Sequence, residues 1–137
     1  MEYYIETGNI YEQLVISNIN VSHEDYHNGN PYNTTFNVNV TSGGFSGFSK
    51  FEYDFKEFIL FIKAIKDLCT FKIQIVELKD ICYGSEIRFS LDKMGHVNVS
   101  GTVYGKAVEH TLIFTFNTDQ TALVPFSNAL YKDFIKD

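Results

Sequence analysis

The segment from Glu86 to Leu130 constrains the fold of this chain more than any other segment does. Its apolar residues stand at every second position in successive runs, and this spacing is typical of half-buried β-strands. Short turn sequences separate the runs at Asp92–Gly95 and Tyr104–Ala107. Strands joined by such short turns pair in antiparallel fashion. The sequence therefore predicts strands at 85–91, 96–104 and 109–117, arranged as consecutive hairpins.

The upstream part of the chain continues the strand pattern, with one irregularity. Residues 34–41 alternate between apolar and polar side chains, and residues 51–55 continue with the same period of two. A further strand is expected at 71–78. In residues 11–21 the apolar positions slip by one near Ser17–Asn18, which predicts a break in that strand. No internal repeat is visible in the sequence.

Two helices are expected, and together with the strands they define the fold class. Asp54 can cap a helix that runs to about Cys69, because apolar side chains recur there at helical spacing. Pro125 marks the start of the last helix, since proline is favoured in the first turn. The prediction is an α+β fold: an antiparallel β-sheet of about six to seven strands with two helices packed on one face, in a single domain spanning residues 1–137.

Several small or polar residues are interpreted as positions that set the fold rather than as a site. The Gly43–Gly47 segment resembles a phosphate-binding loop only superficially, because it lacks the lysine and the strand-to-helix context. A tight turn or bulge, with glycines that permit positive φ, explains it better. Asp119 and Thr121 can cap turns and backbone donors. The predicted fold-setting residues are Gly43, Gly44, Gly47, Gly95, Gly101, Asp119 and Thr121.

The sheet face away from the helices is expected to be polar and almost uncharged. Its predicted members are Asn37, Asn39, Thr41, Asn98, Ser100, Thr102 and Thr115. A solvated antiparallel face needs no function. A flat surface of amides and hydroxyls also suits recognition of a small ligand. A β-rich module that binds a ligand such as a carbohydrate is therefore one hypothesis for the function.

The charge balance restricts the possible partners. The chain carries 17 Asp and Glu against 11 Lys and Arg, for a net charge of −6, and Arg88 is its single arginine. Nucleic-acid binding depends on cations that neutralise phosphates, so this balance argues against direct contact with nucleic acid. An acidic surface can mask a basic protein, although it also serves solubility.

Membrane association and secretion are not expected. No apolar run approaches the length that spans a bilayer, and the first residues lack a basic-plus-apolar signal. We therefore expect a cytoplasmic protein that does not associate with membranes and whose two cysteines, Cys69 and Cys82, stay reduced.

No residue pattern points to catalysis. His23 and His27 stand four positions apart and would share a helix face, but Asn-Gly and Asn-Pro turn signals follow them, so the stretch reads as a loop. Neither Cys69 nor Cys82 carries a signature of a reactive thiolate. We expect no catalytic residues, no metal and no cofactor, and we expect that the protein is not an enzyme.

An ordered set of motifs resembles the WapI family of immunity proteins. The matching elements, within about residues 34–130, are the Gly43–Gly47 turn, the helix at 54–69, Gly95-His96-Val97 with Gly101, and Asp119-Gln120-Thr121 before a short helix. The resemblance implies a small cytosolic bacterial protein that binds and neutralises the C-terminal toxin domain of a cognate polymorphic toxin. Toxins of such systems are often nucleases, which would give the acidic chain a basic partner.

Contacts to such a partner are expected in two acidic loops. The first covers residues 22–33, the longest polar stretch, and the second is the turn at 79–86. Acidic and tyrosine side chains in these loops suit a basic protein surface. The predicted partner-binding residues are Glu24, Asp25, Tyr26, Tyr32, Asp80 and Glu86. The sequence does not indicate an oligomeric state.

Overall fold

The structure is a computed structural model that describes residues 1–106 and 108–135. The predicted turn at Tyr104–Ala107 includes Ala107, which lies outside the described residues. In chain order the elements are β1 (Glu2–Glu6), β2 (Glu12–Val21), α1 (His23–His27), β3 (Thr34–Ser42), β4 (Phe45–Tyr53), α2 (Phe55–Cys69), β5 (Ile75–Lys79), β6 (Glu86–Leu91), β7 (His96–Gly105), β8 (His110–Asp119) and α3 (Gln120–Phe134).

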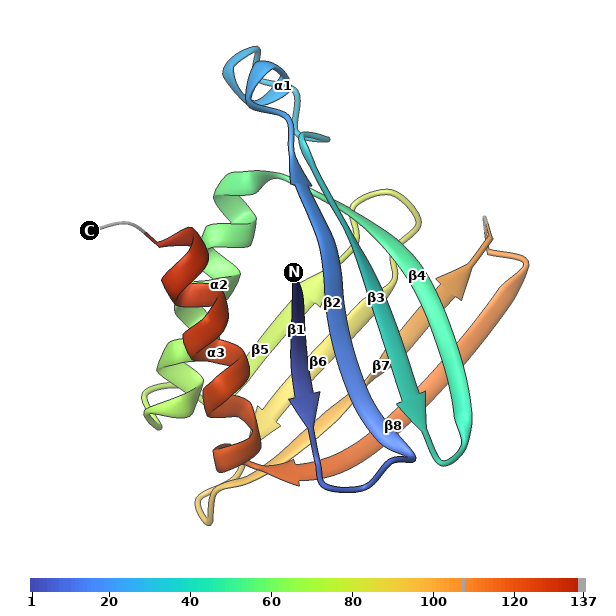
Figure 1. The fold of residues 1–137 in the computed structure, drawn as a ribbon, viewed down its shortest axis with the longest axis vertical. Coiled ribbons are helices and arrows are strands. Elements are labelled where there is room, and N and C mark those ends of the chain that lie inside the picture. The colour runs from blue at the N-terminus through green and yellow to red at the C-terminus, as the bar shows by residue number, and fades with distance from the viewer. Residues whose placement is uncertain (107, 136–137) are drawn as a thin grey trace.

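The strands form two antiparallel sheets, each with its strands in sequence order. One sheet has the order β1-β2-β3-β4 and the other β5-β6-β7-β8. The α+β class is confirmed, but the prediction of a single sheet of about six to seven strands is wrong. Helix α2 follows β4 in the chain, and β4 packs against β7 of the other sheet and does not pair with β5. Figure 1 shows the two sheets crossing beside the helices.

The topology contains a repeat that the sequence does not reveal. Four antiparallel strands followed by a fifteen-residue helix occur twice, first ending in α2 and then in α3. The helices pack against each other, and each lies beside the first strand of the other half: α3 beside β1, and α2 beside β5. The helix of each half therefore packs beside the first strand of the other half.

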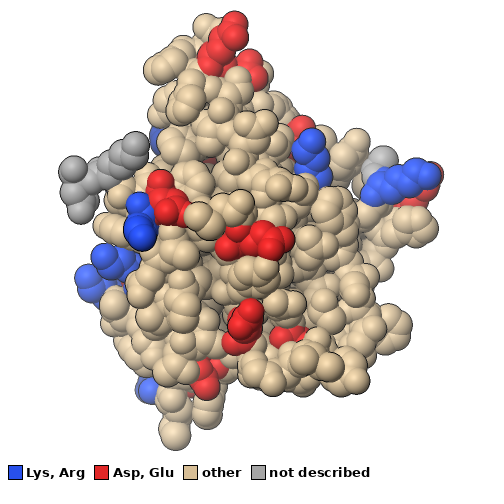
Figure 2. Space-filling view, in the orientation of Figure 1, with Lys and Arg blue, Asp and Glu red and all other residues tan. Residues whose placement is uncertain are grey.

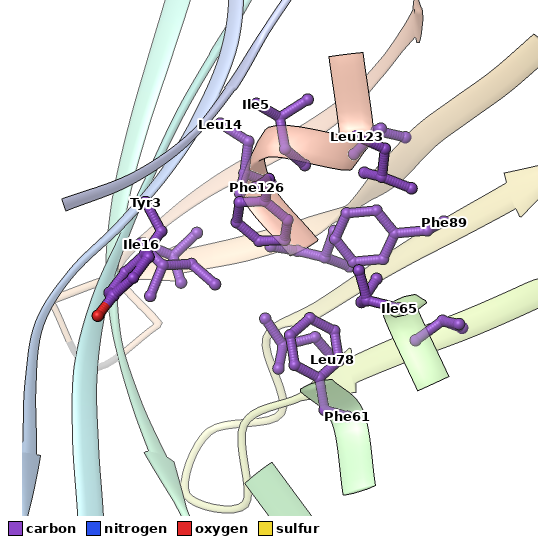
Figure 3. Packing of buried hydrophobic residues seen from close by; sticks show 14 of the residues in the cluster. Tyr3, Ile5, Leu14, Ile16, Phe61, Ile65, Leu78, Phe89, Leu123 and Phe126 are labelled. Atoms are coloured by element: carbon purple, nitrogen blue, oxygen red, sulfur yellow. The ribbon is translucent and has the colours of Figure 1, made fainter. Parts of the chain in front are cut away.

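Both halves contribute to one hydrophobic core. Alternate residues of the second sheet face this core, because Ile87, Phe89 and Val99 are fully buried. An aromatic cluster joins the first sheet to α2, with the ring of Phe36 centred 5.1 Å from that of Phe58. Figure 3 shows core side chains from both sheets and both helices, among them Ile5, Leu14, Leu78, Phe61, Ile65, Leu123 and Phe126.

Local predictions were confirmed where short-range chemistry decides the structure. Strand β2 has its irregularity between Ser17 and Asn20, where Asn18 adopts a φ of 53°. Helix α2 begins after Asp54, whose carboxylate accepts the backbone N–H of Lys56. The strand predicted at 71–78 begins later, at Ile75, because Phe71 has a positive φ of 63° as the chain leaves α2.

The predicted start of the last helix at Pro125 is wrong. Helix α3 begins at Gln120, with Asp119 as its N-cap accepting the backbone N–H of Ala122 at 3.2 Å. Pro125 therefore lies inside the helix, where it provides no N–H for the carbonyl of Thr121. Both residues are exposed, so water can satisfy that carbonyl. None of the helices in the described ranges is long and apolar enough to cross a membrane.

The predicted fold-setting residues act in three different ways. Gly43 and Gly44 form the β3–β4 turn with positive φ, and Gly95 does the same in the β6–β7 turn. Gly47 has no positive φ, so that expectation is wrong. Its role is close packing: a Cβ there would lie 2.8 Å from Leu112. Thr121 donates its hydroxyl to the Asp119 carboxylate, so both residues take part in the capping of α3.

Candidate functional site

The two loops predicted to contact a partner lie side by side. The β2–β3 connection and the β5–β6 connection meet where the Tyr32 hydroxyl donates to the carbonyl oxygen of Ile81, 3.5 Å away and 49 residues distant in sequence. Figure 1 shows α1 at the top of the molecule and the yellow-green β5–β6 loop below it. The fold thus joins two acidic segments that the sequence identified separately.

The first loop is more ordered than the turn signals suggested. His23–His27 form a single helical turn, because Ser22 caps it by accepting the backbone N–H of Asp25 at 3.2 Å. The ring of Tyr26 meets the ring of Phe55 in α2 edge-on, with centroids 5.9 Å apart. This contact anchors the turn on the domain and leaves Glu24 exposed.

His23 and His27 do lie on this helical turn, contrary to the expected loop. Within the described residues, no group of His, Cys, Asp and Glu comes together that could hold a metal ion.

Asp80 holds the second loop in place and is not available to a partner. The residue is only 4% exposed. Its carboxylate accepts backbone N–H groups from Glu52 at 2.7 Å, Cys82 at 3.1 Å and Tyr83 at 2.8 Å. Ser85 ends the loop, and its hydroxyl accepts the N–H of Tyr104 at 2.9 Å. The loop is therefore pre-organised, which lowers the entropic cost of binding.

Large apolar and acidic side chains remain exposed on the joined loops. We name as the loop surface the five residues Glu24, Tyr26, Tyr32, Ile81 and Tyr83. Tyr32 is 50% exposed and Tyr83 54%. Tyrosine is enriched at the centre of protein interfaces, where its rigid ring contributes area at small entropic cost. The chain segments 22–33 and 80–85 contain no lysine or arginine, so the surface is purely acidic in its charges.

The acidic residues predicted as contacts separate into two groups. Figure 2 shows acidic side chains at the tip formed by α1, the location of Glu24 and Asp25. Glu86 lies on the outer face of β6, 3.9 Å from the Lys79 ammonium. Lys79 also pairs with Glu77 at 3.2 Å. Glu86 thus shares this cation with Glu77, and we do not include it in the loop surface.

The sequence did not single out Ile81 and Tyr83. The sequence did contain a signal for them, because both are large side chains in a turn that lacks the period of two of a strand. Residues in such a turn are not expected to face the core, so they are candidates for an exposed apolar surface. Glu52, whose backbone carbonyl accepts the N–H of Ile81 at 3.1 Å, was also not predicted. It belongs to β4, and only the folded chain brings it to the loop.

The environment of Cys82 is the opposite of that of a catalytic thiolate. The residue is exposed, while Cys69 is buried. Hydrogen bonding to the Glu52 carboxylate raises the pKa of the Cys82 thiol, and desolvation and the charges of Glu52 and Asp80 raise it further. A raised pKa reduces the thiolate fraction at neutral pH, and thiolate is the nucleophilic form.

We expect iodoacetamide to alkylate Cys82 more slowly at neutral pH than it alkylates an unstructured cysteine peptide. Glu52→Gln removes the charge that opposes thiolate formation, so it should lower the pKa of Cys82 and accelerate labelling. Mass spectrometry of the proteolysed protein resolves Cys82 from Cys69. Equal rates of Cys82 alkylation in the wild-type protein and in Glu52→Gln would contradict the conclusion that Glu52 raises the pKa of this thiol.

The residues predicted to form one polar face belong to two different sheets. Asn37, Asn39 and Thr41 lie in β3 of one sheet, whereas Asn98, Ser100, Thr102 and Thr115 lie in β7 and β8 of the other. Asn98 donates to the Thr115 hydroxyl at 2.8 Å and to Asn117 at 2.9 Å. The Asn98 amide therefore stabilises the β7–β8 pair, and only the single-sheet premise of the ligand-binding hypothesis is wrong.

Comparison with known proteins identifies a shared fold. No family model matches the chain, and a search of curated proteins finds no significant match. A crystal structure of Trypanosoma bruciei MRP1/MRP2 is similar, with a TM-score of 0.51 over 97% of this chain and 84% of that chain, at 8% sequence identity. At this identity the likeness is one of fold alone, and it extends over both halves of the chain.

Proposed function

We propose that this protein is a non-enzymatic immunity protein, similar to the WapI family, that binds and neutralises a cognate bacterial polymorphic toxin domain in the cytosol. The loop surface is the observation that carries the proposal. It combines exposed tyrosines of two loops that meet at Tyr32 and Ile81 with the acidic charge of Glu24 and Asp25, and neither loop contains a lysine or arginine. A basic partner, such as a nuclease domain, has the complementary charge.

The charges of the chain support rapid association with a basic toxin. Opposite net charge steers diffusional encounter and raises the association rate, and the effect weakens as salt screens it. A toxin must be captured before it acts on the producing cell, so a fast association rate suits this role. The proposed inhibition is steric and electrostatic: the bound chain covers the basic surface through which a nuclease holds its substrate.

Tyr32→Ala is expected to weaken binding to a cognate toxin domain, sought in the gene immediately upstream, by about thirtyfold, which corresponds to a hot-spot loss of about 2 kcal/mol. The matched control is Tyr11→Ala, because Tyr11 is a tyrosine of similar exposure, 58% against 50%, in the β1–β2 turn. Figure 1 shows this turn at the opposite end of the molecule from α1. Isothermal titration calorimetry of the purified pair measures both affinities.

Equal losses for the two tyrosine variants would contradict the position of the interface. A charge-reversing variant, Glu24→Lys, separates steering from contact. It should slow association at low salt while leaving dissociation nearly unchanged, because peripheral charges act mainly on the encounter rate.

A further inference from the structure

A groove separates the edge strand β1 from helix α3, away from the loop surface. Its volume is about 570 Å³. The strand lines it with Glu2, Tyr4 and Glu6, and the helix lines it with Ala122, Pro125 and Ala129. The Tyr3 hydroxyl donates to the Asp133 carboxylate at 2.7 Å and ties the strand to the end of the helix. The walls of the groove are therefore fixed relative to each other.

Strand β1 presents an unpaired edge to this groove. It pairs with β2 on one side only, in register from Glu2 opposite Ser17 to Glu6 opposite Gln13. Among the residues that the structure describes, no hydrogen bond joins the other backbone edge of β1 to the rest of the chain. Exposed edges are templates for a further strand, and natural proteins usually block them.

We propose that β1 and α3 form a docking groove for an extended, basic peptide segment of a protein partner, which pairs with β1 as an additional strand. Addition of a strand supplies backbone hydrogen bonds along the unpaired edge. The small side chains of Ala122 and Ala129 leave room for alternate residues of the peptide to point toward α3. This inference concerns a different surface from the loop surface and does not depend on the proposed function.

The charge of the residues that line the groove favours a basic peptide. The carboxylates that line the groove are Glu2, Glu6 and Asp119, and none of the lining residues is a lysine or arginine. Figure 2 shows acidic side chains over β1, with lysine and arginine lying away from them. Side chains two apart in a strand share a face, so Glu2, Tyr4 and Glu6 present one acidic face to cross-strand neighbours.

The same charges argue against a second copy of this chain in the groove. An antiparallel β1–β1 pair centred on Tyr4 would place Glu2 directly opposite Glu6 of the other copy, and this would occur twice. Like charges directly opposite each other destabilise a strand pair. A basic segment instead gains attraction at both positions.

Two synthetic pentapeptides of alternating sequence test the charge requirement on the intact protein. The probe is acetyl-Lys-Val-Lys-Val-Lys-amide, and its counterpart has glutamate in place of lysine. We expect the lysine peptide to bind with a dissociation constant of about 1 mM or tighter, seen as saturable shifts of β1 and α3 amides in ¹H–¹⁵N spectra. Absence of saturable shifts, or equal binding of the glutamate peptide, would overturn the proposal.

Two N-methylated versions of the lysine peptide test the strand pairing itself. One carries methyl groups on the lysine amides and the other on the valine amides. Alternate N–H groups of a strand face the same neighbour, so only one version should lose at least tenfold in affinity. If both versions bind as tightly as the unmethylated peptide, the peptide is held by charge alone. That result would overturn the proposal that it pairs with β1 as a strand.

Glu2→Lys combined with Glu6→Lys reverses the charge on exposed positions of β1. This variant should weaken binding of the lysine peptide by about tenfold and give the glutamate peptide measurable affinity. Glu24→Lys, on the loop surface, is the control and should leave peptide binding unchanged. Loss of binding in the control alone would place the peptide on the loop surface and contradict the assignment to β1.

Discussion

Asp80→Ala is expected to lower the free energy of unfolding by about 3 kcal/mol, although the residue lies in a loop. Its carboxylate accepts three backbone N–H groups, from Glu52, Cys82 and Tyr83, and the residue is buried. Removing the acceptor leaves these donors without a partner. The N–H of Glu52 belongs to β4, so the substitution also removes a hydrogen bond between the loop and the first sheet, where the bond from the Ile81 N–H to the Glu52 carbonyl remains.

Urea denaturation followed by circular dichroism measures this loss. Asp92→Ala is the matched control: Asp92 also accepts two backbone N–H groups, from Met94 at 2.8 Å and His96 at 2.9 Å, but in an exposed turn. Water can replace that carboxylate, so the control should lose less stability. A loss at Asp80 no larger than at Asp92 would contradict the account of the loop.

Gly101→Ala is expected to destabilise the second sheet by about 3 kcal/mol or more, because it forces two backbones apart. Gly101 stands opposite Ile87 in the β6–β7 pair. A Cβ on Gly101 would lie 2.0 Å from the carbonyl oxygen of Glu86 and 3.0 Å from the Cα of Ile87. Both contacts are to backbone atoms, which cannot move without breaking the strand pairing.

The control for this substitution is Gly43→Ala in the β3–β4 turn. Gly43 has a φ of +59°, but an added Cβ meets nothing within 4 Å. The cost there is conformational only, about 1 kcal/mol. Thermal unfolding of both variants distinguishes a steric conflict at Gly101 from the backbone preference at Gly43. Equal losses of stability would contradict the predicted conflict, because they would show that the strands relax to accept the added methyl group.

The elements that could be predicted from the sequence depend on short-range interactions. Residues 34–41 form β3 because alternate side chains face a core, and Asp54 caps α2 because its carboxylate reaches an N–H two residues on. The slip at Ser17–Asn18 marks a real irregularity of β2. Periodicity and capping are properties of a few consecutive residues, so they can be read without the fold.

The number of sheets and the role of Asp80 were predicted wrongly because both depend on interactions between distant residues. The period of two in each strand does not say which strands share a sheet, so one sheet was predicted where two exist. Asp80 was interpreted as a surface acid, because burial of a polar loop residue depends on β4 lying beside it. The start of α3 was placed at Pro125, although Asp119 offered a capping signal of the same kind as Asp54.

The candidate surface was predicted in part. Both loops were identified from their polar and acidic residues, yet their contact through Tyr32 and Ile81 spans 49 residues and has no local signature. Tyr83 became part of the surface because the buried carboxylate of Asp80 fixes the backbone of its loop. The composition of the loops predicted which two segments form the surface. Only the fold determines which of their side chains lie together on it.

The central claim is that this chain neutralises a toxin by binding it, and the most direct measurement is co-expression with a candidate toxin domain taken from the gene immediately upstream. Growth of the cells and affinity purification of the tagged toxin domain are recorded together. We predict that the chain restores growth and co-purifies with the toxin domain in a complex stable enough to isolate. Cells that stop growing, with no chain retained on the toxin domain, would contradict the account.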